Sequence, residues 1–150
     1  MTTLDSKQIQ ISSAIDLFSK GKINQALEAV QGLLKDYPNE PVLFNIRGAC
    51  FAELGQLDVA VTNYKEAISI KPDYAKAHFN LAGSLHDLGQ LKAAVKSYKK
   101  TLEIEPNYAE AYNNLGNVFQ ELKQGDSAIQ SYKRALEIKP DYVAAQYSLG

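Results

Sequence analysis

Residues 71–74, Lys-Pro-Asp-Tyr, return as Glu-Pro-Asn-Tyr at residues 105–108 and as Lys-Pro-Asp-Tyr at residues 139–142. Pro38 lies the same 34 residues before the proline of the first of these segments. Other residue types recur at the same interval of 34 residues, and one example is the set of alanines that includes Ala94. A fixed period of this length indicates a chain built from one repeated supersecondary unit, and every local assignment has to agree with it.

Within one period the apolar residues follow the spacing of a helix. Tyr112, Leu115, Gly116 and Phe119 fall at i, i+3, i+4 and i+7, which places them on one helical face. A second stripe with helical spacing begins at Ala128 and leads to the next proline. Each repeat is therefore predicted to be a pair of helices, with small residues where the two helices approach closely.

Residues that end or begin a helix also recur at fixed positions of the repeat. Gly55 and Gly89 stand where the first helix of a pair must stop, and glycine tolerates the left-handed conformation that closes a helix. The third repeat has Lys123 in this column and Gly125 two residues later, so we expect either a different turn or a strained Lys123. Each repeat's proline ends the second helix, and the Asn or Asp that follows it is expected to cap the next helix.

This combination of period, small residues, aromatic residues and terminal proline resembles the tetratricopeptide repeat family. The resemblance implies an all-α fold, a right-handed α-solenoid (tetratricopeptide superhelix) of antiparallel helix pairs. It covers nearly the whole chain, so a single array over residues 1–150 is expected. The array divides into one degenerate repeat, three good repeats and a truncated repeat or capping helix: 7–40, 41–74, 75–108, 109–142 and 143–150.

The composition argues against several classes of function. Sixteen basic and seventeen acidic residues leave a net charge of −1, which makes nucleic acid and membrane surfaces poor partners. Cys50 is the only cysteine and is expected to be a small buried hydrophobe, and no Cys or His cluster has metal-site spacing, so no metal or cofactor is expected. No leader-like or membrane-spanning run is present, which favours a cytoplasmic location.

Catalysis is not expected either. His78 and His86 are the only histidines, and His86 is followed by Asp87. No nucleophile, glycine-rich phosphate loop or second acid accompanies this His-Asp pair, so we interpret both histidines as structural.

In the family that the chain resembles, the first helices of the pairs line a concave groove. The resemblance therefore places a set of mostly amide and acidic residues in that groove. The predicted partner-binding residues are Asn45, Glu53, Phe79, Asn80, His86, Asp87, Asn113, Asn114, Asn117, Gln120 and Glu121. Amide side chains offer both donors and acceptors and can bond the backbone of an extended peptide. The alternative interpretation is that asparagine is simply a common residue of this repeat and that its side chains are solvated. The recurring carboxylates of Glu53, Asp87 and Glu121 either favour a basic ligand or merely solvate a helix end.

Two subfamilies can be compared with this face. Arrays that grip the carboxylate-ended tails of heat-shock chaperones use Lys, Asn and Arg from three first helices. Asn80 fits such a clamp, but Glu110 and Asn114 stand where Lys and Arg would be needed, so chaperone-tail binding is not expected. Asn80 and Asn114 in register are similar to the peptide-holding array of protein O-linked N-acetylglucosamine transferases, whose catalytic domain is separate.

The predicted function is a protein-protein interaction scaffold that binds a peptide or protein segment in the groove. One alternative is the substrate-presenting region of a larger enzyme of the glycosyltransferase, sulfotransferase or methyltransferase type. Another is a self-associating structural array. The chain ends on Tyr147 and Leu149 rather than on a polar cap, so we interpret it as a fragment of a longer protein whose exposed end could form a homo-oligomer.

Overall fold

The computed structural model describes residues 2–150, and Met1 lies outside the described residues. The described part of the chain is all-α, with nine helices joined by short turns and no strand. The helices are α1 (Thr3–Ser19), α2 (Ile23–Asp36), α3 (Pro41–Glu53), α4 (Leu57–Ile70), α5 (Ala75–Asp87), α6 (Leu91–Ile104), α7 (Ala109–Glu121), α8 (Gly125–Ile138) and α9 (Val143–Leu149).

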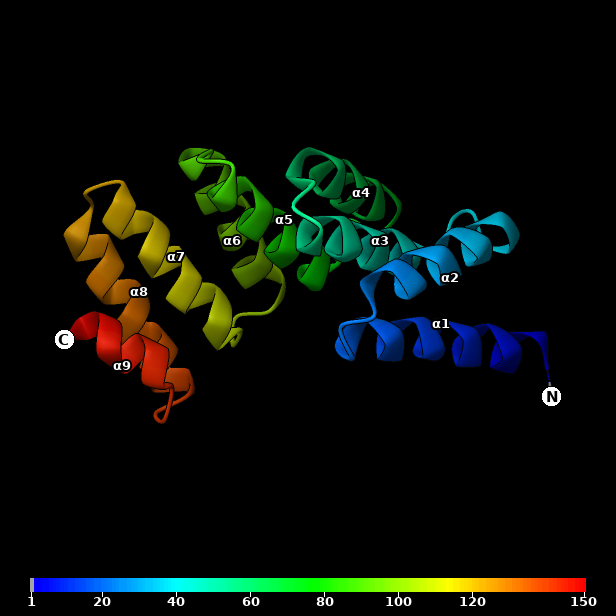
Figure 1. The fold of residues 1–150 in the computed structure, drawn as a ribbon. Helices are drawn as coiled ribbons and strands as arrows, with labels where there is room; N and C mark the ends of the chain where they lie inside the picture. The colour runs from blue at the N-terminus through cyan, green and yellow to red at the C-terminus, as the bar shows by residue number, and fades with distance from the viewer. Residues whose placement is uncertain (1) are drawn as a thin grey trace. The chain divides into compact units, whose positions relative to one another are not determined.

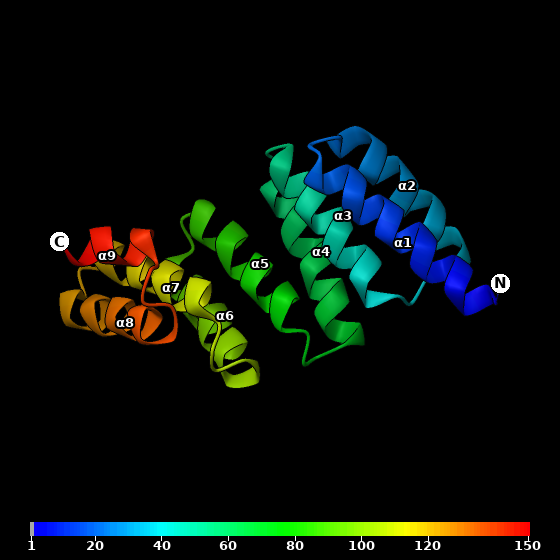
Figure 2. The same cartoon turned by 90° about the horizontal axis from the view of Figure 1, so that it is seen from below.

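The chain divides into two compact units, one that ends at Pro72 and one that begins at Asp73. In the first unit α1 pairs with α2, α3 pairs with α4, and α2 packs against α3 (Figure 1). In the second unit α5 pairs with α6 and α7 with α8, while α6 packs against α7 and α9 against α8 (Figure 2). The predicted all-α class and its helix pairs are confirmed within each unit.

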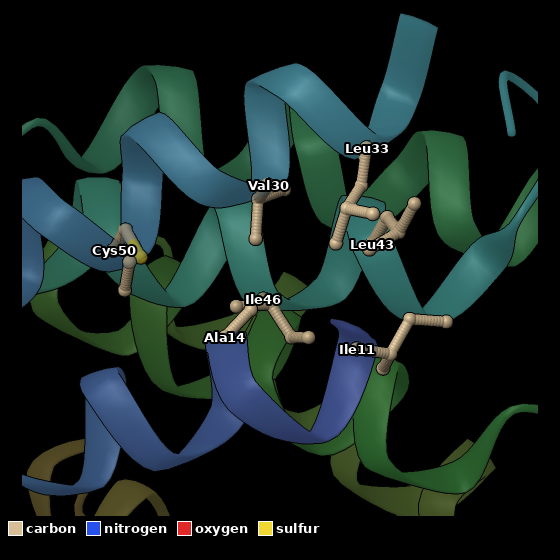
Figure 3. Close-up of a cluster of buried hydrophobic side chains, with 8 residues drawn as sticks. Ile11, Ala14, Val30, Leu33, Leu43, Ile46 and Cys50 are labelled. Atoms are coloured by element: carbon tan, nitrogen blue, oxygen red, sulfur yellow. The ribbon is translucent and has the colours of Figure 1, made fainter. Parts of the chain in front are cut away.

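The core of the first unit lies where α1, α2 and α3 meet (Figure 3). Its buried side chains are Ile11, Ala14, Ala26, Val30, Leu33, Leu43, Ile46 and Cys50. Cys50 is completely buried, and this burial, with a smaller contribution from the charge of Glu53, raises the pKa of its thiol to about 11. Because the protonated thiol is unreactive, the structure agrees with a packing role for Cys50.

Small residues bring the two helices of a pair together, as the sequence predicts. A Cβ atom added to Gly116 of α7 would lie 2.6 Å from Cε1 of Tyr132 on α8. Gly48 of α3 has the same relation to Tyr64 of α4, also at 2.6 Å. Atoms cannot approach so closely without a shift, so the tyrosine rings occupy the space that a side chain would need.

The turns between paired helices need the left-handed conformation. Gly55 and Gly89 have φ values of 77° and 78°, which confirms their predicted role. Lys123 takes the same place with a φ of 62°, the one positive value at a non-glycine residue among the described residues. The third repeat therefore keeps the turn of the other repeats and leaves a lysine in a conformation that its Cβ disfavours.

The predicted capping residues are wrong by one position. The first helices of the second unit are capped by Tyr74, Tyr108 and Tyr142, and none of these caps has a side-chain hydrogen bond. At α7 the backbone carbonyl of Tyr108 instead accepts hydrogen bonds from the amides of Ala111 and Tyr112. The helix begins one residue too late for the preceding Asn107 to act as its cap, so Asn107 is a turn residue.

Candidate functional site

The predicted site residues of the first unit lie on α3. Asn45 is buried, with 7% of its surface exposed, so a ligand on the surface would not reach its side chain. Glu53 is exposed at the last position of α3. The first unit therefore supplies one accessible carboxylate from the predicted set, and the larger part of the candidate site belongs to the second unit.

In the second unit a direct contact joins the two first helices, α5 and α7. His86 Nε2 on α5 lies 2.6 Å from Glu121 Oε1 on α7, close enough for an Nε2–H group to donate a hydrogen bond to the carboxylate. The His86 side chain is 21% exposed and that of Glu121 is 54% exposed. The sequence placed His86 beside Asp87, but His86 bonds a carboxylate of the next repeat.

This contact puts α5 and α7 side by side at one face, which we name the α5–α7 face. Its members are the predicted partner-binding residues of α5 and α7 that are at least partly accessible. They are Phe79, Asn80, His86, Asp87, Asn114, Asn117, Gln120 and Glu121. Asp87, Gln120 and Glu121 are exposed, and the other five are half-buried. The face carries amide, carboxylate and imidazole groups that can bond a ligand's backbone.

Some predicted amides are engaged within the protein. Asn113 is buried, with 5% of its surface exposed, and its Nδ2 donates to Asn114 Oδ1 at 3.4 Å. The Tyr132 hydroxyl donates to Asn117 Oδ1 at 2.6 Å, which ties α8 to α7. Burial raises the pKa of Tyr98 to about 12, and a side-chain hydrogen bond with Asn114 opposes this shift in part. Part of the asparagine pattern therefore stabilises the repeat, and Asn113 does not belong to the accessible face.

An aromatic pocket lies at the amino-terminal end of α5, next to the turn between α6 and α7. Its volume is about 520 Å³. It is lined by Lys76, Phe79, Glu105, Asn107, Tyr108 and Glu110. We name this set the aromatic pocket. Phe79 is the only one of these residues among the predicted partner-binding residues, because the others come from a turn or from the first turn of a helix.

The Phe79 ring organises this pocket. It stacks on Tyr108 with ring centroids 4.8 Å apart and an interplanar angle of 19°, and it meets Tyr98 edge to face at 5.8 Å and 66°. A backbone hydrogen bond from the Tyr108 amide to the Glu105 carbonyl, at 3.3 Å, closes the turn that carries Tyr108. Both aromatic contacts have geometries that aromatic pairs prefer, so the pocket wall is a fixed cluster rather than a set of loose side chains.

Other features of the chain bear on chemistry. Within residues 2–150 no group of three His, Cys, Asp or Glu side chains is arranged to hold a metal ion. Among the helices that the structure describes, none has the length and apolar character to cross a membrane. In α9 the Tyr147 side chain is 87% exposed, while Leu149 is half-buried. Self-association through this end stays a prediction.

Comparison with known proteins settles the family. The TPR repeat family model matches residues 48–89 and 82–123, and the tetratricopeptide repeat family model matches residues 109–142. Together these matches cover well over half of the chain. The chain belongs to the tetratricopeptide repeat family. The resemblance seen in its proline, glycine and alanine columns is thus confirmed, and the matched region includes the α5–α6 and α7–α8 pairs of the second unit.

This tetratricopeptide repeat protein is similar to known proteins in both sequence and structure. The peroxisomal targeting signal receptor of Saccharomyces cerevisiae is 26% identical over 84 residues, which are 56% of this chain and 14% of the receptor. The chain therefore matches about one seventh of that relative's length. PilF of Pseudomonas aeruginosa has a TM-score of 0.91 at 16% identity, covering 97% of this chain and 66% of PilF, and shows the fold alone.

A third comparison concerns a structure with a peptide. The first tetratricopeptide repeat domain of Spaghetti (RPAP3), solved with the HSP90 peptide SRMEEVD, has a TM-score of 0.74 at 27% identity. The match covers 78% of this chain and 93% of that domain.

Proposed function

We propose that this protein is a cytoplasmic interaction scaffold that binds an extended segment of a partner protein along the α5–α7 face. The observation that carries this proposal is the contact between His86 and Glu121, which joins two first helices into one polar surface. Its support among relatives is that one tetratricopeptide domain of similar structure is bound to a peptide. A polar, partly exposed face on two rigid helices offers a binding segment fixed hydrogen-bonding groups.

The amides on this face have a defined task in the proposal. Asn80 on α5 and Asn114 on α7 are 34 residues apart and both half-buried, so they recur at the same place on successive first helices. An asparagine amide carries two donor hydrogens and an acceptor oxygen that can accept twice, so Asn114 Oδ1 keeps acceptor capacity beside its bond from Asn113. Side chains repeated in this way can bond the repeating amides and carbonyls of an extended backbone with little dependence on its side chains.

Charge sets a limit on the ligand. The HSP90 peptide in the RPAP3 complex, SRMEEVD, carries three acidic residues and one basic residue. The α5 and α7 helices present Asp87, Glu110 and Glu121 as exposed carboxylates against one exposed lysine, Lys76. Like charges brought together at an interface reduce affinity, so the proposed ligand of this protein is neutral or basic rather than a peptide of that kind.

The test is a selection of displayed random peptides on the purified protein, followed by affinity measurements on the peptides obtained. We expect peptides with dissociation constants below about 1 mM. The double variant Asn80→Ala, Asn114→Ala should weaken them about tenfold, as expected for the loss of two or more hydrogen bonds. Gln130→Ala, which removes an exposed amide from α8, is the matched control and should bind normally.

Circular dichroism would show that the double variant keeps its helices. A selection that yields no peptide, or a double variant that binds as well as the wild type, would overturn the proposal. In the second case the ligand would lie on another surface, and the Gln130 control would show whether the α8 side is involved.

A further inference from the structure

The aromatic pocket already holds one cation of the chain itself. The Lys76 ammonium lies 5.2 Å from the centroid of the Phe79 ring, and its Nζ donates to the Tyr108 hydroxyl at 3.4 Å. A cation above an aromatic ring is attracted by the negative charge of the ring face. Lys76 is an exposed residue on the first turn of α5, so its side chain is free to leave the ring for solvent. The pocket therefore has a surface that attracts a cation and an occupant that can be displaced.

Two carboxylates line the pocket. Glu105 and Glu110 line it on either side of Tyr108 in sequence, and both are exposed. Their negative charges add to burial in raising the pKa of Tyr108 to about 12, burial being the larger cause. Both carboxylates are therefore near enough to the Tyr108 hydroxyl to act on it electrostatically.

Neither carboxylate, Glu105 or Glu110, forms an ion pair within the part of the chain that the structure describes. With Lys76 the two acids give the pocket a formal charge of −1. If Lys76 swings away to solvent, the pocket offers two carboxylates and an aromatic face without a counter-ion. This combination has the chemistry to receive a positively charged group with an apolar stem.

We propose that the aromatic pocket receives an arginine or lysine side chain of the segment that binds the α5–α7 face, with its cationic head between Glu105 and Glu110. The inference rests on the proposed function, because Phe79 is a member of both surfaces. The methylene stem lies along Phe79 and Tyr108, and Lys76 gives up its place over Phe79. A planar guanidinium can stack on a ring and bond a carboxylate at once, so arginine is the preferred occupant.

The opposite assignment would make Lys76 the recognition group for a ligand carboxylate. Such a ligand would have to approach Glu105 and Glu110, which outnumber Lys76 at the pocket. The two assignments predict opposite effects of removing Lys76. Loss of this lysine should strengthen the binding of a cation, because a competing and repelling charge disappears, and should weaken the binding of an anion.

Matched peptides test the proposal directly. The probes are acetyl-Ala-Ala-Arg-Ala-Ala-amide, the same peptide with citrulline in place of arginine, and the same peptide with glutamate. Citrulline keeps the shape and most hydrogen-bonding groups of arginine but has no charge. We expect the arginine peptide to bind the full chain with a dissociation constant near or below about 1 mM, and the citrulline and glutamate peptides about tenfold more weakly. Binding is followed by nuclear magnetic resonance shifts of the Phe79 and Tyr108 signals.

Variants locate the effect. Glu105→Gln with Glu110→Gln should bring the arginine peptide down to the affinity of the citrulline peptide, and Lys76→Gln should raise its affinity about threefold. Asp58→Asn with Glu66→Gln removes the same charge from exposed positions on α4 and should change nothing beyond the general effect of net charge. All the substituted residues are exposed, so the helices should survive.

Equal affinity of the arginine and citrulline peptides, or an arginine peptide unaffected by the Glu105, Glu110 double variant, would overturn the inference. This failure differs from failure of the proposed function. If peptides are selected and depend on Asn80 and Asn114, but keep their affinity when their basic residues are replaced by citrulline, the face binds peptides and the pocket does not read a cation. If no peptide is selected and the arginine peptide does not bind, both proposals fail.

Discussion

Gly116 shows how one residue decides the spacing between two helices. The Tyr132 ring lies against the backbone of α7 at this residue, and Tyr132 is only 1% exposed, so protein atoms surround the ring on nearly all sides. The Tyr132 hydroxyl is held by Asn117 at 2.6 Å, which further restricts the ring. Any side chain at residue 116 must therefore push α7 and α8 apart or break this hydrogen bond.

The substitution Gly116→Ala should lower the free energy of unfolding by about 1 to 3 kcal/mol, because overpacking outweighs the better helix propensity of alanine. Gly83→Ala on α5 is the matched control, since a Cβ there would meet only the Tyr98 hydroxyl at 3.8 Å. That control should be neutral or stabilising by up to about 1 kcal/mol. Urea denaturation followed by circular dichroism measures both, and a Gly116→Ala midpoint at or above that of Gly83→Ala would contradict the packing described.

At the scale of the helix and its turn, Lys123 departs from the rule that the other repeats follow. Its φ of 62° matches the 75° to 78° of Gly21, Gly55 and Gly89, so all four first helices end in the same conformation. The elements on both sides hold this geometry, because α8 can begin at Gly125 only if the chain reverses here. The turn is thus set by the packing of α7 on α8, and the lysine accommodates it at a cost.

Replacing this lysine should stabilise the protein. Lys123→Gly should raise the free energy of unfolding by about 1 kcal/mol, because glycine enters the left-handed region without a Cβ clash. The reciprocal change, Gly89→Lys, should cost a similar amount, since Gly89 has a φ of 78°. Thermal denaturation of the two variants beside the wild type is the measurement. A destabilised Lys123→Gly protein would mean that the lysine side chain contributes more than its backbone costs.

Helices and turns were predictable from the sequence because their signals are local. The helix pairs, the small residue at Gly116 and the unusual turn at Lys123 follow from spacing within one period and were confirmed. The capping prediction failed at Asn107, since a residue type that favours caps does not fix the helix start to one position. The cap is Tyr108, which keeps its backbone role without a side-chain bond.

The site was less predictable because accessibility and pairing depend on neighbouring helices. The family resemblance placed Asn45 and Asn113 in the binding groove, yet the packing of their units buries both. The aromatic pocket combines Phe79 of one repeat with Tyr108 of the turn that leads to the next. A tyrosine recurs at the position of Tyr108 in the last three Pro-Asp/Asn-Tyr segments, which marks it as structural but does not reveal that its ring stacks on Phe79.

At the scale of the whole molecule, each unit contains an ionisable group whose charged form its interior disfavours. Burial raises the pKa of Cys50 in the first unit from 9.0 to about 11 and that of Tyr98 in the second unit from 10.0 to about 12. Both residues are essentially excluded from solvent, at 0% and 1% exposure. In the unfolded chain the two groups lose their protons at lower pH than in the folded protein.

The protein should therefore lose stability in alkali. The stabilisation from these groups is fully present below about pH 9 and declines as pH rises from there toward pH 12, because only the unfolded chain ionises in that interval. We expect the free energy of unfolding to fall by about 2 to 4 kcal/mol between pH 8 and pH 11. Urea unfolding across this range measures the slope, and Cys50→Ala with Tyr98→Phe should reduce it while costing some stability at every pH. A stability independent of pH in the wild type, or a slope unchanged in the double variant, would mean that other groups control the alkaline behaviour of the two units.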